Sequence, residues 1–531
     1  MKKTILFNLL FVLCHLVQAQ EVDYAPKYPE ARNGFYILSP KIKPSPKING
    51  ANVFGVRPGS KFLYTIPASG DKPMTFSTSP LPKGLSLDSK TGIISGTIEN
   101  KDIKDYKIVL KAKNAKGKDS KEFTIKVGNT ICLTPPLGWN SFNSWARRNV
   151  TQERVLKSAR AMVDKGLNDF GFSYINIDVG WQGKRGGEYN AIQPNEKFPD
   201  IKAMYDEIHA LGLKGGIYSS PWITTYGAGV GGSSDNKDGK WDKSMIDPKG
   251  TKLKNSAYRR IGKYKFDAID VKQWVEWGVD YLKYDWQPND AESIVRMADA
   301  LDASGRDIVL SLSNNAHFDI IELCKTRVQC WRSGVDLKDR WNTDGKAWNL
   351  LQEWDKQRKW LDEGYRGGPG HFPDPDMLVV GDLSSTDSNV LLRPSNLTPD
   401  EQYTHITLWT LWASPMLIGC PIEYMDMFTL GLFKNSEVID VHQDAVAIPG
   451  KTILNENGIE IIVKDLENGK KAVGLFNKND SEEVVTLNFK AAGISGDKKI
   501  RDVWRNKDIG TFKDTFSAKV RPHGVVFIKI E

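Results

Sequence analysis

Acidic residues stand at the ends of short apolar segments in the middle of this chain. The segment YLKYDW at 281–286 places Lys283 and Asp285 two residues apart, and WRSGVD at 331–336 contains Arg332 and Asp336. Because side chains of a strand alternate between its faces, Lys283 and Asp285 should point to the same side. A cation and a carboxylate on a buried strand are costly to keep, which favours a role in chemistry.

Two facing carboxylates surrounded by aromatic rings suit the hydrolysis of a glycosidic bond. One carboxylate attacks the anomeric carbon or activates water, and the other protonates the leaving oxygen. Lys283 should favour the ionised form of Asp285, as a nucleophile requires, and Asp336 should lie further out, toward the leaving group. Rings near these acids could stack on a sugar, although Trp181 and Trp286 fit core packing equally well: Trp139, Phe142, Trp181, Tyr218, Trp286 and Trp331.

The elements that must position these residues alternate between strand and helix from residue 131 to 444. About eight such units predict a central (β/α)8 TIM barrel, in which function collects at the carboxyl ends of the strands. Helix starts are expected near Thr151, at Asp270 as a cap, and at a capping box formed by Thr398 and Glu401. Strands are expected at 174–179, 213–218, 280–286 and 307–313.

The barrel is expected to lie between two β-domains, so the predicted fold class is multidomain. Residues 51–129 read as short alternating strands with glycine turns and resemble an N-terminal Ig-like β-sandwich, to which no chemistry is assigned. Residues 445–531 return to strands and predict a C-terminal antiparallel β-sandwich. Residues 20–50 are rich in proline and lysine near their end and predict an extended linker.

The first 19 residues have the pattern of a secretory signal. Lys2 and Lys3 precede an apolar run that ends in small residues, with cleavage expected after Ala19. We therefore expect export to the periplasm, or a secreted or surface position in a bacterium. No segment is long enough to predict a membrane span.

Charge and cysteine content exclude several classes of protein. The net charge of +8 comes from 73 dispersed basic and 65 acidic residues, which predicts a solvated surface and no nucleic-acid partner. The four cysteines beyond the signal, together with His317 and His371, have no metal-ligand spacing, so neither a metal nor a cofactor is expected. Buried free thiols are the expected state, although Cys324 and Cys330 could lie close together.

Six phrases in order resemble glycoside hydrolase family twenty-seven, the melibiase-type α-galactosidases and α-N-acetylgalactosaminidases. They extend over about three quarters of the chain with the C-terminal sandwich included: TPPLGWNSF, YINIDVGW, GLKGGIYSS, YLKYDW, WRSGVDLKDRW and DPDMLVVG. The resemblance implies a retaining mechanism with Asp285 as nucleophile and Asp336 as acid/base. It also implies that the sugar contacts Asp178, Lys283, Arg332, Tyr218, Phe142, Trp181 and Ser313.

Several positions depart from the family pattern, and they concern the sugar. Val179 stands where the family has a second aspartate, which replaces a hydroxyl acceptor with an apolar wall. Ser313 and Ala316 resemble the arrangement that makes room for an acetamido group. An insertion at 224–243 could fold over the mouth of the barrel. Substrates that stay open are α-galactosides, β-L-arabinopyranosides, α-N-acetylgalactosaminides and other α-glycosides in an oligo- or polysaccharide, and the alternative function is a non-catalytic carbohydrate-binding protein.

Overall fold

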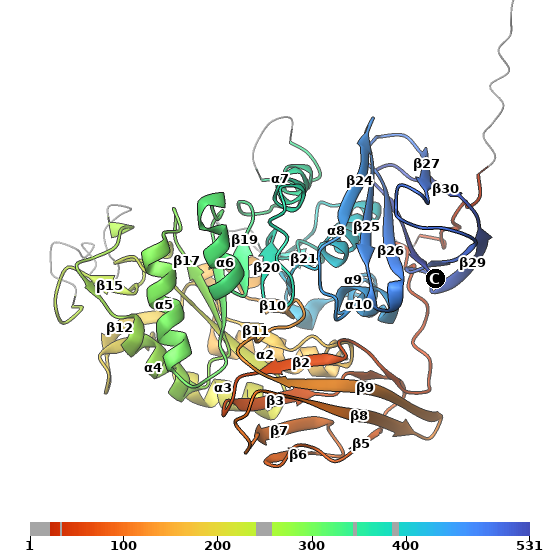
Figure 1. Ribbon diagram of the computed structural model, residues 1–531. Coiled ribbons are helices and arrows are strands. Elements are labelled where there is room, and N and C mark those ends of the chain that lie inside the picture. The colour runs from red at the N-terminus through yellow and green to blue at the C-terminus, as the bar shows by residue number, and fades with distance from the viewer. Residues whose placement is uncertain (1–21, 32–33, 241–257, 344–347, 385–391) are drawn as a thin grey trace, which may run out of the picture.

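The computed structural model describes residues 22–31, 34–240, 258–343, 348–384 and 392–531. The predicted signal at 1–19 lies outside these ranges, as does the end of the insertion. The described chain forms an N-terminal β-module, a central barrel and a C-terminal β-sandwich (Figure 1). The predicted fold class is confirmed.

In the described ranges, the barrel consists of eight parallel strands, and the first seven pair in the order in which they follow along the chain. Strand β23 returns to pair with β10. Beyond the end of β20 the N–H of Leu378 donates to the carbonyl of Leu417 at 2.9 Å, which closes the ring. The strands are β10 (Leu137–Asn140), β11 (Tyr174–Asn176), β14 (Lys214–Ser219), β17 (Tyr281–Asp285), β18 (Val309–Ser313), β19 (Cys330–Arg332), β20 (Phe372–Asp374) and β23 (Met416–Ile418).

Helices connect these strands and cover the outside of the ring. Thr151 caps α2 by accepting from the N–H of Arg154, and Thr398 and Glu401 form the predicted capping box of α8. The helices are α1 (Phe142–Asn149), α2 (Gln152–Asp164), α3 (Ile201–Ala210), α4 (Asp267–Trp277), α5 (Ala291–Ala303), α6 (Ile321–Arg327), α7 (Leu350–Asp362), α8 (Pro399–Leu411), α9 (Met427–Phe433) and α10 (Ser436–His442).

The prediction that Asp270 caps a helix was wrong. Helix α4 begins three residues earlier, after Phe266, and Asp270 lies in its first turn. Its carboxylate binds the guanidinium of Arg185 at 2.7 Å, and both side chains are buried. An aspartate near a helix start fits either role in sequence, and here a buried cation from a distant hairpin decides between them.

The N-terminal module contains two small sheets with one shared core. The first sheet runs in the order β2 (Val53–Val56), β9 (Gly117–Val127), β8 (Lys104–Asn114) and β5 (Thr75–Thr78), and the second in the order β3 (Lys61–Thr65), β7 (Ile93–Thr97) and β6 (Leu85–Leu87). Strand β1 (Lys47–Ile48) pairs with β4 (Ala68–Ser69), so the end of the expected linker takes part in the module.

The C-terminal sandwich has its own buried core. One sheet has the order β24 (Lys451–Glu456), β25 (Ile459–Asp465), β26 (Lys471–Asn477), β31 (Val525–Ile530), β28 (Lys498–Asp502) and β29 (Lys507–Phe512), and the other pairs β27 (Glu483–Asn488) with β30 (Thr515–Val520). Short hairpins elsewhere are β12 (Gln182–Gly186) with β13 (Ala191–Pro194), β15 (Ser233–Ser234) with β16 (Tyr264–Lys265), and β21 (Asp382–Leu383) with β22 (Arg393–Pro394).

The N-terminal module is docked on the side of the barrel where the strands begin. Arg57 binds Asp302 at 2.7 Å and Asp307 at 2.8 Å, and Thr65 donates to the carbonyl of Gly212 at 2.8 Å. Gly212 and Asp307 both precede barrel strands. The module therefore does not cover the opposite face, where the strands end. Figure 1 shows the module lying along this side of the barrel.

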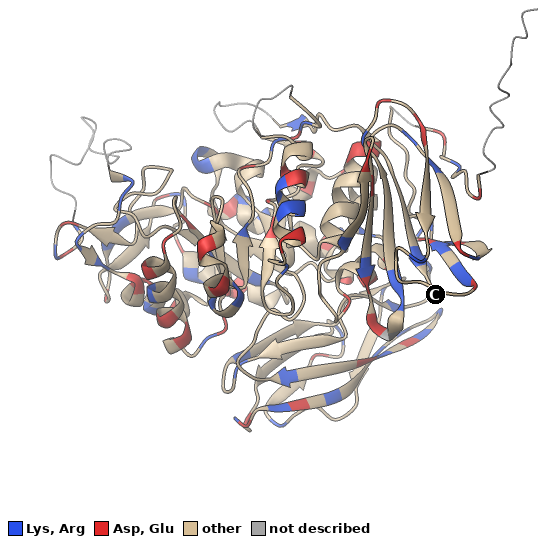
Figure 2. Ribbon diagram, turned by 45° about the horizontal axis from the view of Figure 1, so that its top comes forward, with Lys and Arg blue, Asp and Glu red and all other residues tan. Residues whose placement is uncertain are grey.

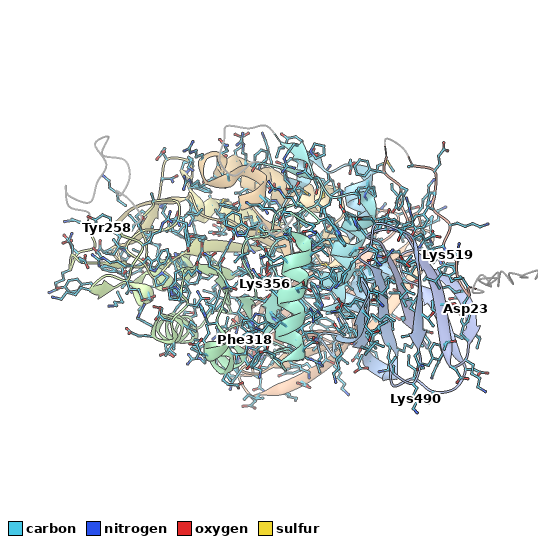
Figure 3. All side chains as sticks on the ribbon, turned by 90° about the horizontal axis from the view of Figure 1, so that it is seen from above. Asp23, Tyr258, Phe318, Lys356, Lys490 and Lys519 are labelled. Atoms are coloured by element: carbon cyan, nitrogen blue, oxygen red, sulfur yellow. The ribbon has the colours of Figure 1, made fainter. Side chains whose placement is uncertain are left out.

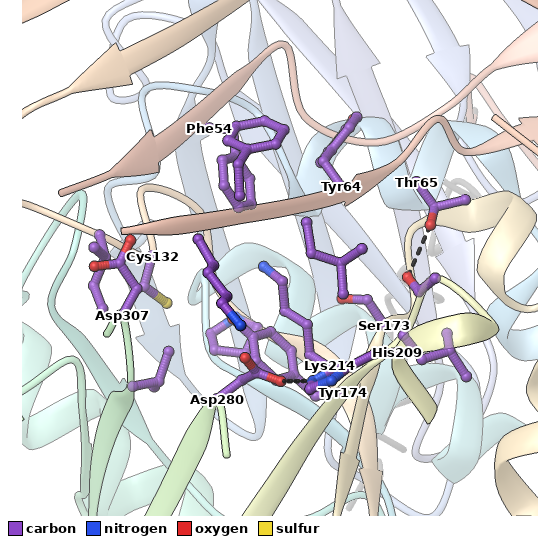
Figure 4. A pocket seen from close by; sticks show the side chains of 18 of the residues that line it. Phe54, Tyr64, Thr65, Cys132, Ser173, Tyr174, His209, Lys214, Asp280 and Asp307 are labelled. Atoms are coloured by element: carbon purple, nitrogen blue, oxygen red, sulfur yellow. Dashed lines mark hydrogen bonds and ion pairs between the residues drawn. The ribbon is translucent and has the colours of Figure 1, made fainter. Parts of the chain in front are cut away.

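A cavity of about 480 Å³ lies between the module and the barrel. Phe54 and Tyr64 line it from the module, while Tyr174 and Lys214 line it from the barrel (Figure 4). The ammonium of Lys214 lies 4.4 Å from the centre of the Phe54 ring. Because these barrel residues begin strands β11 and β14, this cavity is at the end away from the predicted acids.

The segment before the module runs back to the C-terminal sandwich. Asp23 accepts from the N–H of Ser517 at 2.7 Å, and Tyr24 donates its hydroxyl to Asp502 at 2.7 Å. Figure 3 shows Asp23 beside this sandwich, on the same side as Lys519, whose N–H donates to the carbonyl of Tyr24. The N-terminal end of the described chain is therefore bound to the C-terminal sandwich.

Candidate active site

The carboxyl ends of the barrel strands bring the predicted acids together. Asp285 is the last residue of β17 and Asp374 the last of β20, while Asp178 follows β11 by two residues and Asp336 follows β19 by four. In a closed parallel barrel these ends surround one opening. The placement agrees with the sequence prediction, but it does not by itself assign roles.

Asp285 is a buried carboxylate with both oxygens hydrogen-bonded. The hydroxyl of Tyr218 donates to one oxygen at 2.6 Å, and the side-chain amide of Asn314 donates to the other. Such donors favour the ionised form and fix the direction of the carboxylate. Tyr218, on the adjacent strand β14, therefore holds the Asp285 carboxylate, and Asn314 is an unpredicted second partner.

Burial outweighs these donors in setting the protonation of Asp285. It raises the pKa of Asp285 to about 6, with Lys283 and Tyr218 lowering it and the charges of Asp178 and Asp336 raising it. Lys283 nevertheless lowers the pKa of Asp285 and so favours its ionised form, as expected from the sequence. The opposing charge of Lys283 is present, but it is the smaller influence.

Lys283 is held by Asp178. Its ammonium binds the Asp178 carboxylate at 2.7 Å, and the backbone N–H of Asp178 donates to the Ser141 hydroxyl at 2.9 Å. Burial lowers the pKa of Lys283, but the charges of Asp178, Asp285 and Asp376 together raise it above its usual value, so the ammonium stays charged. The ring of Phe142 has its centre 5.9 Å from this ammonium. Three residues predicted to bind the sugar thus lie in one cluster.

Arg332 links Asp336 to the acids at the end of β20. Its guanidinium binds Asp376 at 2.7 Å and Asp336 at 3.4 Å. Arg332 is buried, whereas the Asp336 side chain is 51% exposed. Arg332 and Asp336 are therefore paired, but alternation along a strand is not the reason. Strand β19 ends at Arg332, and the turn that follows carries Asp336. Burial also raises the pKa of Asp374 to about 6, although Arg332 opposes this.

Trp181 is buried in the core of the barrel domain. Its side chain is 0% exposed, its indole N–H donates to the carbonyl of Tyr218 at 2.9 Å, and its ring packs edge-on against Trp277. These contacts favour core packing for Trp181, and its contact with the sugar stays a prediction, as it does for the equally buried Tyr218. Trp286 is also core, whereas Ser313 is buried in register opposite Asp285, on strand β18.

The loop after β14, which the sequence analysis identified only as an insertion, packs against Val179. Val179 is 3% exposed, and a Cβ placed on Gly227 would come within 2.5 Å of its side chain. Burial and the charges of Asp285 and Asp336 raise the pKa of the Tyr226 hydroxyl in the same loop. The glycine-rich run GAGVGG was the available signal, since close backbone approach requires small residues.

Among the described residues no group of three or more His, Cys, Asp or Glu side chains has an arrangement that could hold a metal ion. In those same ranges no helix is long and apolar enough to cross a membrane. Basic and acidic residues are interspersed over the helices and the sandwiches (Figure 2). The four cysteines beyond the predicted signal are free, and Cys324, Cys330 and Cys420 are buried.

A closed parallel barrel whose strand ends gather buried carboxylates, a lysine and an arginine fits the class of barrel glycoside hydrolases. Residues 134–247 and 244–444 match the family described as "Alpha galactosidase A", and residues 456–530 match its "C-terminal beta sandwich domain". Residues 46–128 match the "Putative Ig domain" family. The chain belongs to the α-galactosidase (melibiase) family and is a glycoside hydrolase.

Named relatives agree with this assignment. An α-galactosidase of Oryza sativa is 30% identical over 74% of this chain and 84% of its own length, and one of Cellvibrio japonicus is 30% identical over 75% and 92%. A "putative alpha-galactosidase" of Bacteroides fragilis is 31% identical, with a TM-score of 0.78 over 92% of this chain and 98% of its own. A GH27 β-L-arabinopyranosidase of Geobacillus stearothermophilus is 27% identical, with a TM-score of 0.63 over 75% and 97%.

Proposed function

We propose that this chain is an exported, retaining exo-glycosidase that hydrolyses terminal α-D-galactosyl bonds of an oligo- or polysaccharide. The observation that carries the proposal is Asp285, a buried carboxylate at the barrel mouth whose oxygens are held by Tyr218 and Asn314. Asp336 is near enough to raise its pKa, yet exposed enough to meet a leaving group. Two carboxyl groups with these environments suit nucleophile and acid/base.

The proposed reaction is a double displacement. Asp285 attacks the anomeric carbon while the bond to the leaving oxygen breaks, and Asp336 donates its proton to that oxygen. In the second step Asp336 accepts a proton from water, the water oxygen attacks the anomeric carbon, and Asp285 is released. Lys283, Asp178 and Arg332 offer donors and acceptors for the sugar hydroxyls.

A β-L-arabinopyranoside is the second candidate substrate, because of Val179. This side chain is apolar and covered by Gly227, so it offers no acceptor to a hydroxyl group. A pentopyranose lacks the exocyclic hydroxymethyl group of galactose and needs fewer acceptors. The likeness to a β-L-arabinopyranosidase supports including this sugar. Ser313 and Ala316 are small and buried, and small residues here would leave room for an acetamido group. α-N-acetylgalactosaminides are therefore a further candidate substrate.

The test is release of nitrophenol from α-galactoside, β-L-arabinopyranoside, α-N-acetylgalactosaminide and α-glucoside. Asp285→Asn should lose at least ~10³ of the wild-type rate, whereas the exposed control Asp497→Asn should not change it. Proton NMR of the first sugar released should show the anomeric configuration of the substrate. Undiminished activity in Asp285→Asn would disprove the mechanism, and sugar binding without turnover by wild type would favour the carbohydrate-binding alternative.

Export has a separate test. Expression of the full chain in a bacterium with a secretory pathway should give a periplasmic or released protein whose N-terminus begins after Ala19. A protein that keeps Met1 and stays with the cytoplasm would contradict the predicted signal.

A further inference from the structure

Glu353, on helix α7, is a buried carboxyl group that the proposed reaction does not use. Its side chain is 1% exposed, and neither oxygen makes a well-directed hydrogen bond to a described residue. The ammonium of Lys356 lies 3.8 Å from one oxygen, outside hydrogen-bond distance. A carboxyl group left this way is costly, so its retention calls for an explanation.

The carboxyl group of Glu353 lies directly against Gly334. A Cβ on Gly334 would lie 1.1 Å from one oxygen of Glu353 and 2.2 Å from its carboxyl carbon. Glycine is required at this position because the acid fills the space that a side chain would need. Gly334 is two residues from Arg332 and two from Asp336, in the turn that carries Asp336 away from β19.

The same turn is held at both ends by Asp376. One oxygen of Asp376 binds Arg332 at 2.7 Å, and the other accepts from the backbone N–H of Leu337 at 2.8 Å. Asp376 therefore fixes where the turn starts and where it stops. Glu353 is the group packed against its middle.

We propose that Glu353 is a positioning residue, whose carboxyl group supports the turn at Gly334 from beneath and thereby fixes the direction of Asp336. The inference rests on the proposed role of Asp336 as acid/base. Glu353 does not touch the reacting atoms; it acts through the turn and through Arg332.

Charge gives this support a pH dependence. Burial raises the pKa of Glu353 to about 8, and the charge of Asp376, in the loop after β20, raises it further. Three groups lower this pKa: Lys356 on the same helix, Arg332 on β19 and the backbone N–H of Val335. The acid is thus neutral at pH 7. Above about pH 8 it becomes a carboxylate that competes for Arg332 with Asp336, whose 3.4 Å contact is the longer of the two that Arg332 makes.

The experiment compares Glu353→Ala, Glu353→Gln and Asp355→Asn, an exposed control on the same helix, on whichever panel glycoside wild type hydrolyses. Glu353→Ala should lower kcat about tenfold, since small displacements of a catalytic group have large effects. The loss should be greater for an alkyl than for a dinitrophenyl leaving group, because only the alkyl group needs protonation by Asp336. Glu353→Gln keeps the shape but cannot ionise, so it should recover most of this loss and remove the alkaline inflection of kcat/KM near pH 8.

Melting temperatures establish that each variant is folded. The inference is overturned if folded Glu353→Ala has the wild-type dependence on leaving group, or if Glu353→Gln keeps the alkaline inflection. Failure of the proposed function would look different: Asp285→Asn would then retain activity, or wild type would hydrolyse no glycoside.

Discussion

Asp285 sets the expected acid limb of the pH profile. A nucleophile works in its ionised form, so kcat/KM should rise with pH through about 6, the pKa that burial gives this carboxyl group. Removing the Tyr218 hydroxyl, which favours the ionised form, should raise that pKa. We expect Tyr218→Phe to move the limb upward by about one pH unit, since a hydrogen bond to a charged group is worth about 1.5 kcal/mol or more. An unmoved limb would show that another group controls it.

Val179 is the residue expected to decide between sugars. Val179→Asp restores an acceptor, so the ratio of kcat/KM for α-galactoside to that for β-L-arabinopyranoside should rise by about 5- to 160-fold, given ~1–3 kcal/mol for a buried polar contact. Val179→Ala is the matched control, because it removes the isopropyl group without supplying an acceptor. Equal ratios in the two variants would rule out the absent acceptor as the cause.

Single residues could be assigned from sequence when a motif fixed both their type and their strand. Asp178, Asp285 and Arg332 follow or end strands, so the barrel rule located them correctly. Trp181 could not be assigned in this way, because an aromatic ring beside an acid looks the same whether it faces a sugar or Trp277. Glu353 gave no local signal at all. Its importance appears only when α7 is packed against Gly334.

At the scale of elements, the loop after β14 and the end of β11 form one packed unit. Gly227 lies so close to Val179 that an added methyl group would overlap it. Gly227→Ala should therefore lower the free energy of unfolding by about 1–3 kcal/mol, the usual effect of overpacking, and raise KM. The measurement is thermal or urea unfolding together with KM.

A double variant tests whether this contact is the cause. Val179→Ala makes room for the new methyl group, so the Val179→Ala/Gly227→Ala variant should lose less stability than the two single changes added together. Strict additivity would mean that Gly227 acts through its own backbone.

Elements were predicted where local signals and the tertiary structure agree. The box of Thr398 and Glu401 marked the start of α8, because both side chains bond to the helix end itself. Asp270 failed as a marker because its partner, Arg185, comes from a hairpin 85 residues away. No local pattern reports such a partner.

At the scale of the whole molecule, the N-terminal module and the barrel mouth lie at opposite ends of the barrel. Arg57 joins the module to Asp302 and Asp307. Arg57→Ala should weaken this attachment by roughly 1–3 kcal/mol, lost with the charged hydrogen bonds, and leave kcat/KM unchanged. Calorimetry should show a lower or split unfolding transition, whereas the exposed control Lys118→Ala should not. A fall in kcat/KM of folded Arg57→Ala would mean that the module influences the active site.

The pairing of Asp23 and Tyr24 with Ser517 and Lys519 has a consequence for the time at which the fold is completed. The contact between Asp23 and Ser517 spans 494 positions. At about 5–20 residues per second, the ribosome needs roughly 25 to 100 seconds between the two ends of that contact. Wherever the rest of the chain folds, residues 23–24 stay unpaired until the last strands are present. Completion of the native state is thus a post-translational event, and until then the early segment is open to proteases and to other chains.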